Sequence, residues 1–167
     1  MTAQTHTACV ALGANIDDPV QQISAGFAAL AALPGTRVVA RSSLYRSAPV
    51  GYADQPDFIN AVATIETTLA PHDLLEALLA IERAHGRVRA FPNAPRTLDL
   101  DIVLYGDMTV HEPGLTIPHA RMLERAFVMV PLAEIAPDAM VPGHGCVRDL
   151  ATRVDAGSVA QLLRVPV

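Results

Sequence analysis

The pattern of apolar and polar positions predicts strands in four parts of the chain. Leu98, Leu100, Ile102 and Leu104 alternate with Asp99, Asp101 and Val103. A period of two is that of a β-strand and predicts one apolar face for this segment. Residues 57–67 alternate too, with Ile59, Ala61, Ala63 and Ile65 on one side and Phe58, Asn60, Val62 and Thr64 on the other. The short apolar run at 8–12 and the segment 36–46 predict two further strands.

Apolar residues recur with a helical period after the predicted strand at 8–12 and again after the one at 57–67. Apolar residues at 20, 23, 27 and 30 predict a helix capped by Asp17 or Asp18, with Pro19 in its first turn, that ends before 34–35. Residues 71–86 predict a second helix, which begins at a proline and ends at a glycine. Its apolar stripe contains Leu74, Leu75, Leu78, Leu79 and Ile81.

The rest of the chain carries weaker signals. Segments 48–56 and 87–95 contain several prolines and predict loops. Gly106 and Asp107 predict a turn that pairs the strand at 98–104 with residues 108–111. We expect a short strand at 115–117, short helices at 120–126 and 131–136, and, after Pro137, an irregular segment with one more helix or edge strand.

The order of these elements predicts the fold. Strand, helix, strand, strand, helix, strand is the order of the ferredoxin-like split βαβ arrangement, an α+β fold. The short connection between 36–46 and 57–67 favours antiparallel pairing. The sequence therefore predicts a mainly antiparallel sheet with helices packed on it. A length of 167 residues predicts one domain, 1–167.

Composition narrows the functional classes. The net charge is −5, and all twelve basic residues are arginine, which argues against general nucleic-acid binding and against a lysine nucleophile. No apolar stretch reaches the ~18 residues of a membrane span, and no signal peptide is apparent. Cys9 and Cys146 lie far apart, which is typical of free thiols in a reducing compartment. We expect a cytoplasmic protein that does not act at a membrane.

Asp99 and Asp101 are the most informative polar residues. On one face of a strand they lie roughly 7 Å apart at the backbone, where two carboxylates repel unless a cation sits between them. Mg²⁺ is the natural candidate, because it binds through one or two carboxylates together with substrate phosphates. Arg87, Arg89 and Arg96 come just before the pair and suit phosphate oxygens. Together these residues suggest phosphoryl or pyrophosphoryl transfer.

Six stretches in order make the chain resemble the 6-hydroxymethyl-7,8-dihydropterin pyrophosphokinases of folate biosynthesis. They are residues 12–15 (LGAN), 42–46 (SSLYR), 54–61 (DQPDFINA), 86–89 (GRVR), 95–102 (PRTLDLDI), and the segment that runs from Pro118 and His119 to Arg125 and Phe127. The resemblance implies an enzyme that transfers the β,γ-pyrophosphate of ATP to the hydroxymethyl group of the reduced pterin and releases AMP. It also implies two Mg²⁺ ions and a monomer.

The resemblance implies roles for individual residues. Asp99 and Asp101 would bind metal, and Arg89 and Arg96 would act with them in catalysis. The residues implied at ATP are Glu82, Arg87, Arg89, Arg96, Ile102, Thr116, His119 and Arg125. The residues implied at the pterin are Ser47, Ala48, Val50, Phe58, Asn60, Asp99 and Phe127. Leu79, Gly114 and Ala120 depart from the common pattern, which implies weaker ATP binding.

Simpler interpretations exist for several of these residues. Glu82 is equally well placed to face solvent or to hold the loop arginines or the nucleotide. Phe58 and Phe127 are also ordinary core residues, and a lone histidine such as His119 is usually structural. The whole chain has two alternatives, a binding module without catalysis and a ferredoxin-like domain that binds a protein partner. Retention of both Asp99 and Asp101 favours the enzyme.

Overall fold

A computed structural model describes residues 4–49, 54–86 and 97–162. One sheet forms its centre, with the strand order β10-β3-β4-β1-β5 and β2 paired beside β4. These strands are β1 (His6–Ala14), β2 (Thr36–Arg41), β3 (Tyr45–Ser47), β4 (Phe58–Thr67), β5 (Asp99–Tyr105) and β10 (Val159–Gln161). All neighbouring strands are antiparallel. The α+β fold with a split βαβ order is confirmed.

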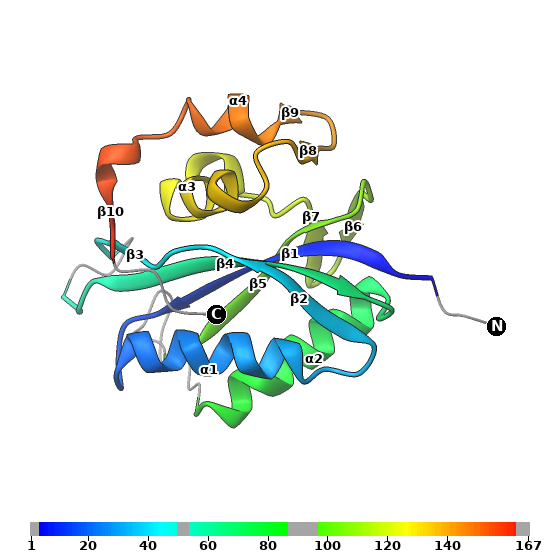
Figure 1. The fold of residues 1–167 in the computed structure, drawn as a ribbon, viewed down its shortest axis with the longest axis horizontal. Helices are drawn as coiled ribbons and strands as arrows, with labels where there is room; N and C mark the ends of the chain where they lie inside the picture. Colours follow the sequence, from blue (N-terminus) through cyan, green and yellow to red (C-terminus); the bar gives the residue numbers. More distant parts are fainter. Residues whose placement is uncertain (1–3, 50–53, 87–96, 163–167) are drawn as a thin grey trace.

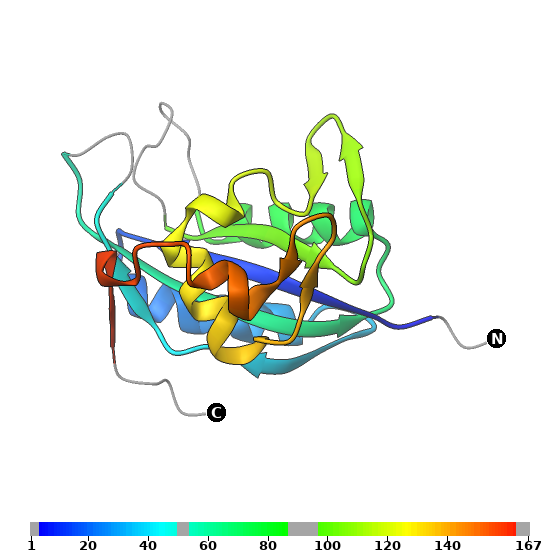
Figure 2. The ribbon, with the colours of Figure 1, turned by 90° about the horizontal axis from the view of Figure 1, so that it is seen from above.

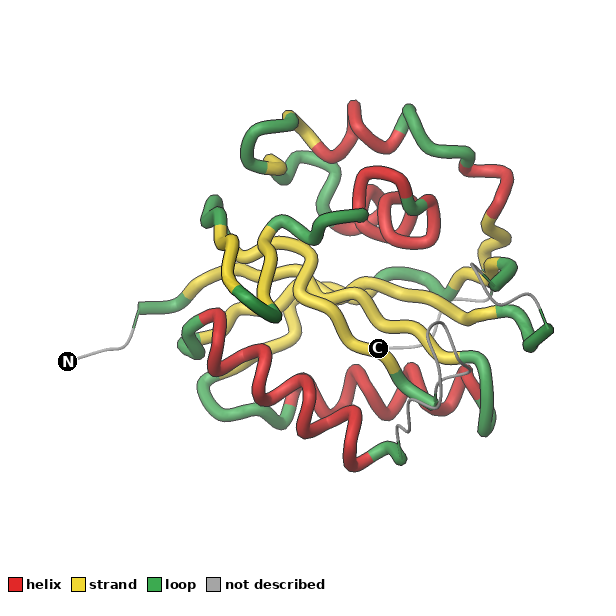
Figure 3. The backbone as a smooth tube through the Cα atoms, turned by 180° about the vertical axis from the view of Figure 1, so that it is seen from behind, coloured by secondary structure: helices red, strands yellow, loops and turns green. Residues whose placement is uncertain are grey.

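Helices cover both faces of this sheet. Helices α1 (Pro19–Ala31) and α2 (Pro71–Ala84) lie under one face, whereas α3 (Ala126–Ile135) and α4 (Val147–Ala151) lie over the other (Figure 1). Figure 3 shows the same three layers from behind. Each helix layer has its own hydrophobic cluster, and the strands contribute alternate residues to the two clusters.

Strand β4 shows how the pattern produces these layers. Ile59, Ala61, Ala63 and Ile65 belong to the cluster under α1 and α2, whereas Val62 belongs to the cluster under α3. The predicted alternation in 57–67 is therefore confirmed. Because β4 lies between β1 on one side and β2 and β3 on the other, it is buried over most of its length.

The expectation of a single strand over 36–46 was wrong. The segment forms two strands, β2 and β3, which both pair with β4. At the break, the side chain of Ser42 accepts a hydrogen bond from the amide of Val62 at 2.9 Å. The next residue, Ser43, donates its amide and its hydroxyl to Glu134 of α3. Ser42 keeps one backbone hydrogen bond to Val62, and the contacts of Ser43 tie the break to the helix layer above.

The expected face of Leu104 was also wrong. The pairing of β1 with β5 shifts between Cys9, which faces Leu104, and Val10, which faces Ile102. Val103 is thus an extra residue, a β-bulge, and it reverses the alternation after Ile102. Leu104 packs in the α3 cluster, and Tyr105 packs in the cluster under α1 and α2.

The predicted pairing of 98–104 with 108–111 was wrong as well. A turn does follow at Gly106, where φ is 54°, but β6 (Val110–Glu112) pairs with β7 (Leu115–Ile117). The expected strand at 115–117 is confirmed. The resulting hairpin lies beside the β5 edge of the sheet, as seen from above in Figure 2.

Helix boundaries differ from the predictions in part. Helix α1 begins at Pro19 as expected, but Asp17 and Asp18 are left-handed, and Asp18 gives no side-chain cap. Leu79 is 40% exposed and does not join the α2 stripe. The two short helices expected in 120–136 are a 3₁₀ turn, η1 (Met122–Glu124), and α3, which contains Pro131.

The segment after Pro137 contains the expected additional helix and edge strand. It consists of the pair β8 (Met140–Val141) and β9 (Gly145–Cys146), then α4, the turn η2 (Ala156–Ser158), and β10. Strand β10 pairs with β3 and extends the sheet. Across the described parts of the chain, no helix is long and apolar enough to span a bilayer.

Candidate active site

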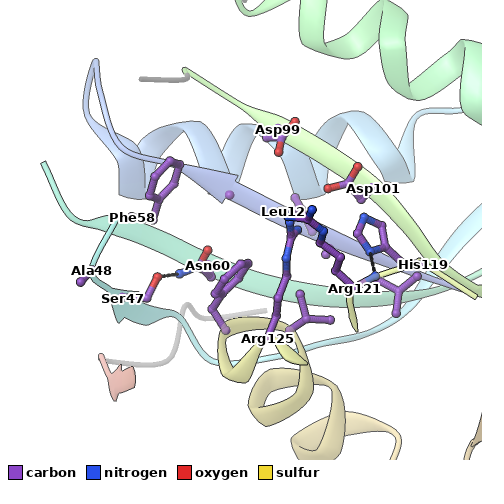
Figure 4. A pocket seen from close by; sticks show the side chains of 15 residues that line it. Leu12, Ser47, Ala48, Phe58, Asn60, Asp99, Asp101, His119, Arg121 and Arg125 are labelled. Carbon is purple, nitrogen blue, oxygen red and sulfur yellow. Dashed lines mark hydrogen bonds between the residues drawn. The ribbon is translucent and has the colours of Figure 1, made fainter. Parts of the chain in front are cut away.

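A pocket opens between the sheet and the segments around η1 and α3 (Figure 4). Four neighbouring strands, β3, β4, β1 and β5, form it together with the chain from His119 into α3, so residues far apart in sequence meet there. Its lining residues are Ala11, Leu12, Gly13, Ser47, Ala48, Phe58, Asn60, Asp99, Asp101, Val103, His119, Arg121, Arg125, Phe127 and Val128.

Alternation along β5 places both aspartates in this pocket. Leu100, between them, is buried in the cluster on the opposite face, so Asp99 and Asp101 project together toward the pocket. Their neighbours across the strand pair are Gly13 and Ala11. Because these two residues are small, no long side chain of β1 covers the carboxylates.

The two carboxylates suit a hard divalent cation. Both aspartates are half-buried, and within the described ranges no third histidine, cysteine or acidic residue joins them to complete a metal cluster. Mg²⁺ typically takes one or two protein carboxylates and fills its other positions with water and substrate phosphate oxygens. The donor set therefore fits a magnesium ion that is held jointly by the protein and a phosphorylated substrate.

The opposite end of the pocket has fixed hydrogen-bonding groups and an aromatic ring. Asn60 is 4% exposed, and its amide donates to the hydroxyl of Ser47 at 2.7 Å across the β3–β4 pair. Phe58 lies two residues earlier on the same face of β4. A methyl group on Gly13 would lie 3.5 Å from Asn60 Oδ1 and 4.0 Å from Phe58 Cδ1, so the glycine keeps this floor open. A flat polar heterocycle fits such a surface.

Positive charge comes from the chain between β7 and α3. His119, Arg121 and Arg125 all line the pocket, and the Arg125 guanidinium lies 5.4 Å from the centre of the Phe127 ring. Burial and the charge of Arg125 lower the pKa of His119, Asp99 opposes this shift, and Arg121 adds to it. His119 is therefore neutral at pH 7.

The hydrogen bond at His119 fixes its tautomer. Nδ1 accepts the backbone N–H of Arg121 at 3.2 Å, so the neutral ring carries its proton on Nε2. Its own backbone N–H donates to the carbonyl of Val103 at the bulge. The imidazole is thus held as a hydrogen-bond donor beside β5, which suits a phosphate oxygen.

Most of the predicted site residues that the structure describes meet in this pocket. It brings together Ser47, Ala48, Phe58, Asn60, Asp99, Asp101, His119, Arg125 and Phe127. It does not bring Glu82, Ile102 or Thr116 to the lining. Val50, Arg87, Arg89 and Arg96 lie outside the described residues.

Glu82 does not face solvent, so that alternative was wrong. It is 2% exposed, and its carboxylate accepts the backbone N–H of Leu100 at 2.7 Å, between the two aspartates. The side chain of Ile102 is buried in the core, and Thr116 is exposed on β7. The roles of these three residues at ATP stay predictions.

Arg121 and Gly13 line the pocket but were not among the predicted site residues. Gly13 stood in the motif at 12–15 without a role of its own, because its pairing with Asp99 depends on the register of β1 with β5. Arg121 stands two residues after His119, on the same pocket-facing turn. A count of cations near His119 would have found it.

The pocket, in which two carboxylates of β5 lie opposite histidine and arginine side chains, fits an enzyme that binds a metal ion together with a phosphorylated substrate. Residues 9–137 match the family described as 7,8-dihydro-6-hydroxymethylpterin-pyrophosphokinase. The chain belongs to this family.

Curated relatives support this membership. The chain is 54% identical over 133 residues to the 2-amino-4-hydroxy-6-hydroxymethyldihydropteridine pyrophosphokinase of Pseudomonas aeruginosa. The aligned region covers 80% of this chain and 82% of that protein. It is 49% identical over 144 residues to the enzyme of the same name from Haemophilus influenzae, with 86% and 90% covered.

Solved structures share the fold. The wild-type Plasmodium falciparum HPPK-DHPS with pteroate aligns at a TM-score of 0.72 and 14% identity. The alignment covers 92% of this chain but only 43% of that longer one. At this identity the likeness concerns the fold alone.

Proposed function

We propose that the pocket above β1, β4 and β5 is where the family's reaction takes place. The chain is a transferase that moves pyrophosphate from ATP to the hydroxymethyl group of 6-hydroxymethyl-7,8-dihydropterin in folate biosynthesis and releases AMP. ATP is its co-substrate, and Mg²⁺ is the metal that the family uses. The observation that carries the site assignment is the pair Asp99 and Asp101, on one strand face between an amide-lined end and a cationic end.

The amide-lined end is proposed to bind the pterin. Asn60 is oriented by Ser47, so its amide group is ready for the polar edge of a heterocycle. Phe58 and Phe127 are proposed to stack against the ring, and Ala48 and Val50 to contribute backbone groups. This arrangement would point the hydroxymethyl group toward β5.

The cationic end is proposed to bind the triphosphate. Nε2–H of His119 and the guanidinium of Arg125 donate to phosphate oxygens, and Arg87, Arg89 and Arg96 are proposed to act with them. Glu82, Ile102 and Thr116 are proposed nearer the nucleotide; the buried Glu82 acts by fixing the β5 backbone at Leu100.

Asp99 and Asp101 are proposed to hold two Mg²⁺ ions. When bound, the metal supplies charge neutralisation of the phosphates and acidification of the attacking hydroxyl. The two aspartates orient the reactants, because phosphoryl transfer depends mainly on positioning and electrostatic stabilisation. A metal titration followed by calorimetry in the presence of an ATP analogue would give a stoichiometry of two.

We also propose that residues 1–167 form one domain that acts as a monomer in the cytoplasm. Helices on both faces of the central six-stranded sheet support the one domain. Both cysteines are free, which supports a reducing compartment. Light scattering would test the monomer.

A direct assay tests the activity. The protein is mixed with Mg²⁺, ATP and the hydroxymethyl-dihydropterin, and AMP is measured. AMP that appears only when all three are present supports the enzyme, and EDTA should stop its release. A protein that binds the pterin and ATP but releases no AMP would instead be the non-catalytic binding module.

A further inference from the structure

Arg121 is a positively charged residue of the pocket to which neither the motifs nor the proposed function assigns a role. It lines the pocket from the residue just before η1. Figure 4 shows its side chain and that of Arg125 running from the α3 side toward β1 and the aspartates of β5. Two guanidinium groups thus enter one pocket from the same side.

The turn η1 holds the two arginines in this arrangement. Met122, the first residue of the turn, is buried in the α3 cluster, and the amide of Arg125 closes the turn on the carbonyl of Met122 at 3.1 Å. The backbone N–H of Arg121 is bound to His119. The backbone on both sides of the turn is therefore fixed, whereas the guanidinium of Arg121 extends freely into the pocket.

The two arginines share the pocket with Asp99 and Asp101 but are not held by an ion pair to any residue that the structure describes. Neither guanidinium forms an ion pair with any acidic residue in the described ranges, in contrast to Arg37 with Glu66 and Arg148 with Asp138. Two guanidinium groups that enter one pocket without an ion-pair partner repel each other. Their field reaches His119, whose pKa both arginines lower. An anion with more than one charge would relieve this repulsion.

Arg121 differs from Arg125 in its surroundings. Arg125 lies over the ring of Phe127, near the proposed pterin end, and is half-buried. Arg121 is exposed and lies beside His119, on the side of Asp101. Of the two substrates, the phosphate chain therefore suits Arg121 better than the heterocycle.

We propose that Arg121 is a further binding residue for the polyphosphate chain of ATP, and this inference rests on the proposed function of the pocket. A guanidinium donates two parallel hydrogen bonds to phosphate oxygens, and it acts here with His119 and Arg125. Glu124 and Asp155 line a neighbouring hollow together with Arg121 and are its alternative, purely structural partners.

The test compares Arg121→Gln, Arg121→Lys and the matched control Arg148→Gln in the full chain. Calorimetry with Mg²⁺ measures the Kd of a non-hydrolysable ATP analogue and of AMP, and steady-state kinetics measure KM for ATP and for the pterin. Loss of one charge-assisted contact predicts about tenfold or more weaker binding of the ATP analogue by Arg121→Gln. We expect less than about a twofold change for AMP and for the pterin, because these ligands lack the triphosphate.

The two other variants sharpen the result. Arg121→Lys keeps the charge but loses the paired hydrogen bonds, so it should restore part of the affinity. Arg148→Gln removes an exposed arginine far from the pocket and should change neither constant.

Several outcomes would overturn the proposal. These are an unchanged Kd for the ATP analogue in Arg121→Gln, an equal loss for AMP, a rise in the pterin KM alone, or a lower melting temperature with normal ATP affinity. Failure of the wild type to release AMP would count against the proposed function. The Kd comparison still tests Arg121 in that case.

Discussion

The two faces of the central sheet contrast in what covers them. Under α1 and α2, the sheet is packed by one continuous apolar cluster. On the other face, α3 and α4 cover only part of the strands, and the uncovered part carries the pocket. From Asp99 to Ile102 the residues of β5 alternate between the two faces, and buried Leu100 separates Asp99 from Asp101. In this part of β5, core packing and the pocket therefore lie on opposite sides of the same backbone.

The largest effect on activity should come from the pocket face of β5. We expect Asp99→Asn and Asp101→Asn each to lower kcat by about two to three orders of magnitude, because each removes a metal carboxylate. Stability should change far less than activity, because both side chains line the pocket and belong to neither packed cluster. An AMP assay and urea unfolding measure the two quantities.

The matched control is Asp107→Asn, in the exposed turn after β5, which should leave both quantities unchanged. If either pocket variant kept more than about a tenth of the wild-type rate, the metal assignment would be wrong.

A mutation on the opposite face of β5 should lower stability and leave activity nearly unchanged. Leu100→Ala should lower the free energy of unfolding by about 2–5 kcal/mol, because it leaves a cavity in the packed cluster. The rate per folded molecule should change far less than in the aspartate variants. Leu79→Ala, at an exposed position of α2, is the control and should cost much less. Equal losses of stability in the two leucine variants would contradict the assignment of Leu100 to the packed core face of β5.

A smaller effect is expected at the amide-lined end of the pocket. Asn60→Ala should raise KM for the pterin about tenfold, because it removes the group that Ser47 orients, and should leave ATP affinity unchanged. Steady-state kinetics with each substrate varied in turn would measure both effects. A rise in KM for ATP instead would place the pterin elsewhere.

The smallest effect concerns pH. The pKa of His119 is lowered from its ordinary value of 6.5, so the unfolded chain binds more protons between the lowered value and 6.5. Stability should therefore fall as pH falls through this window, and His119→Asn should show less of this decrease. Urea midpoints at about pH 7.5 and about pH 5.5 would measure it. An identical pH dependence in both proteins would contradict the lowered pKa.

The sequence predicted the elements whose signals are local. Alternation in 57–67 and the helical period before Pro34 depend on residues close in the chain, and both predictions held. The break at Ser42 and Ser43 depends on Val62 and on Glu134, 91 residues away from Ser43. The reversal at Leu104 depends on the register with β1. No local pattern contains that information.

The same distinction applies to the site. Asp99 and Asp101 were predicted from one strand, and the motifs named most of the other lining residues that the structure describes. Arg121 belongs to the pocket because a buried methionine anchors its turn above β5. The burial of Glu82 follows from a hydrogen bond to the backbone of Leu100, which no side-chain pattern records.

The bulge at Val103 has a consequence for how this enzyme can be redesigned. Before the bulge, the odd-numbered residues Asp99 and Asp101 face the pocket. After the bulge, the even-numbered Leu104 faces the α3 side and the odd-numbered Tyr105 faces α1 and α2. Deleting Val103 would change which face each residue on one side of the deletion occupies. Either Asp99 and Asp101 would then point into the hydrophobic core, or Leu104 and Tyr105 would each move to the opposite hydrophobic cluster. The bulge thus allows one strand of seven residues to carry both the two aspartates of the pocket and the buried side chains of Leu104 and Tyr105.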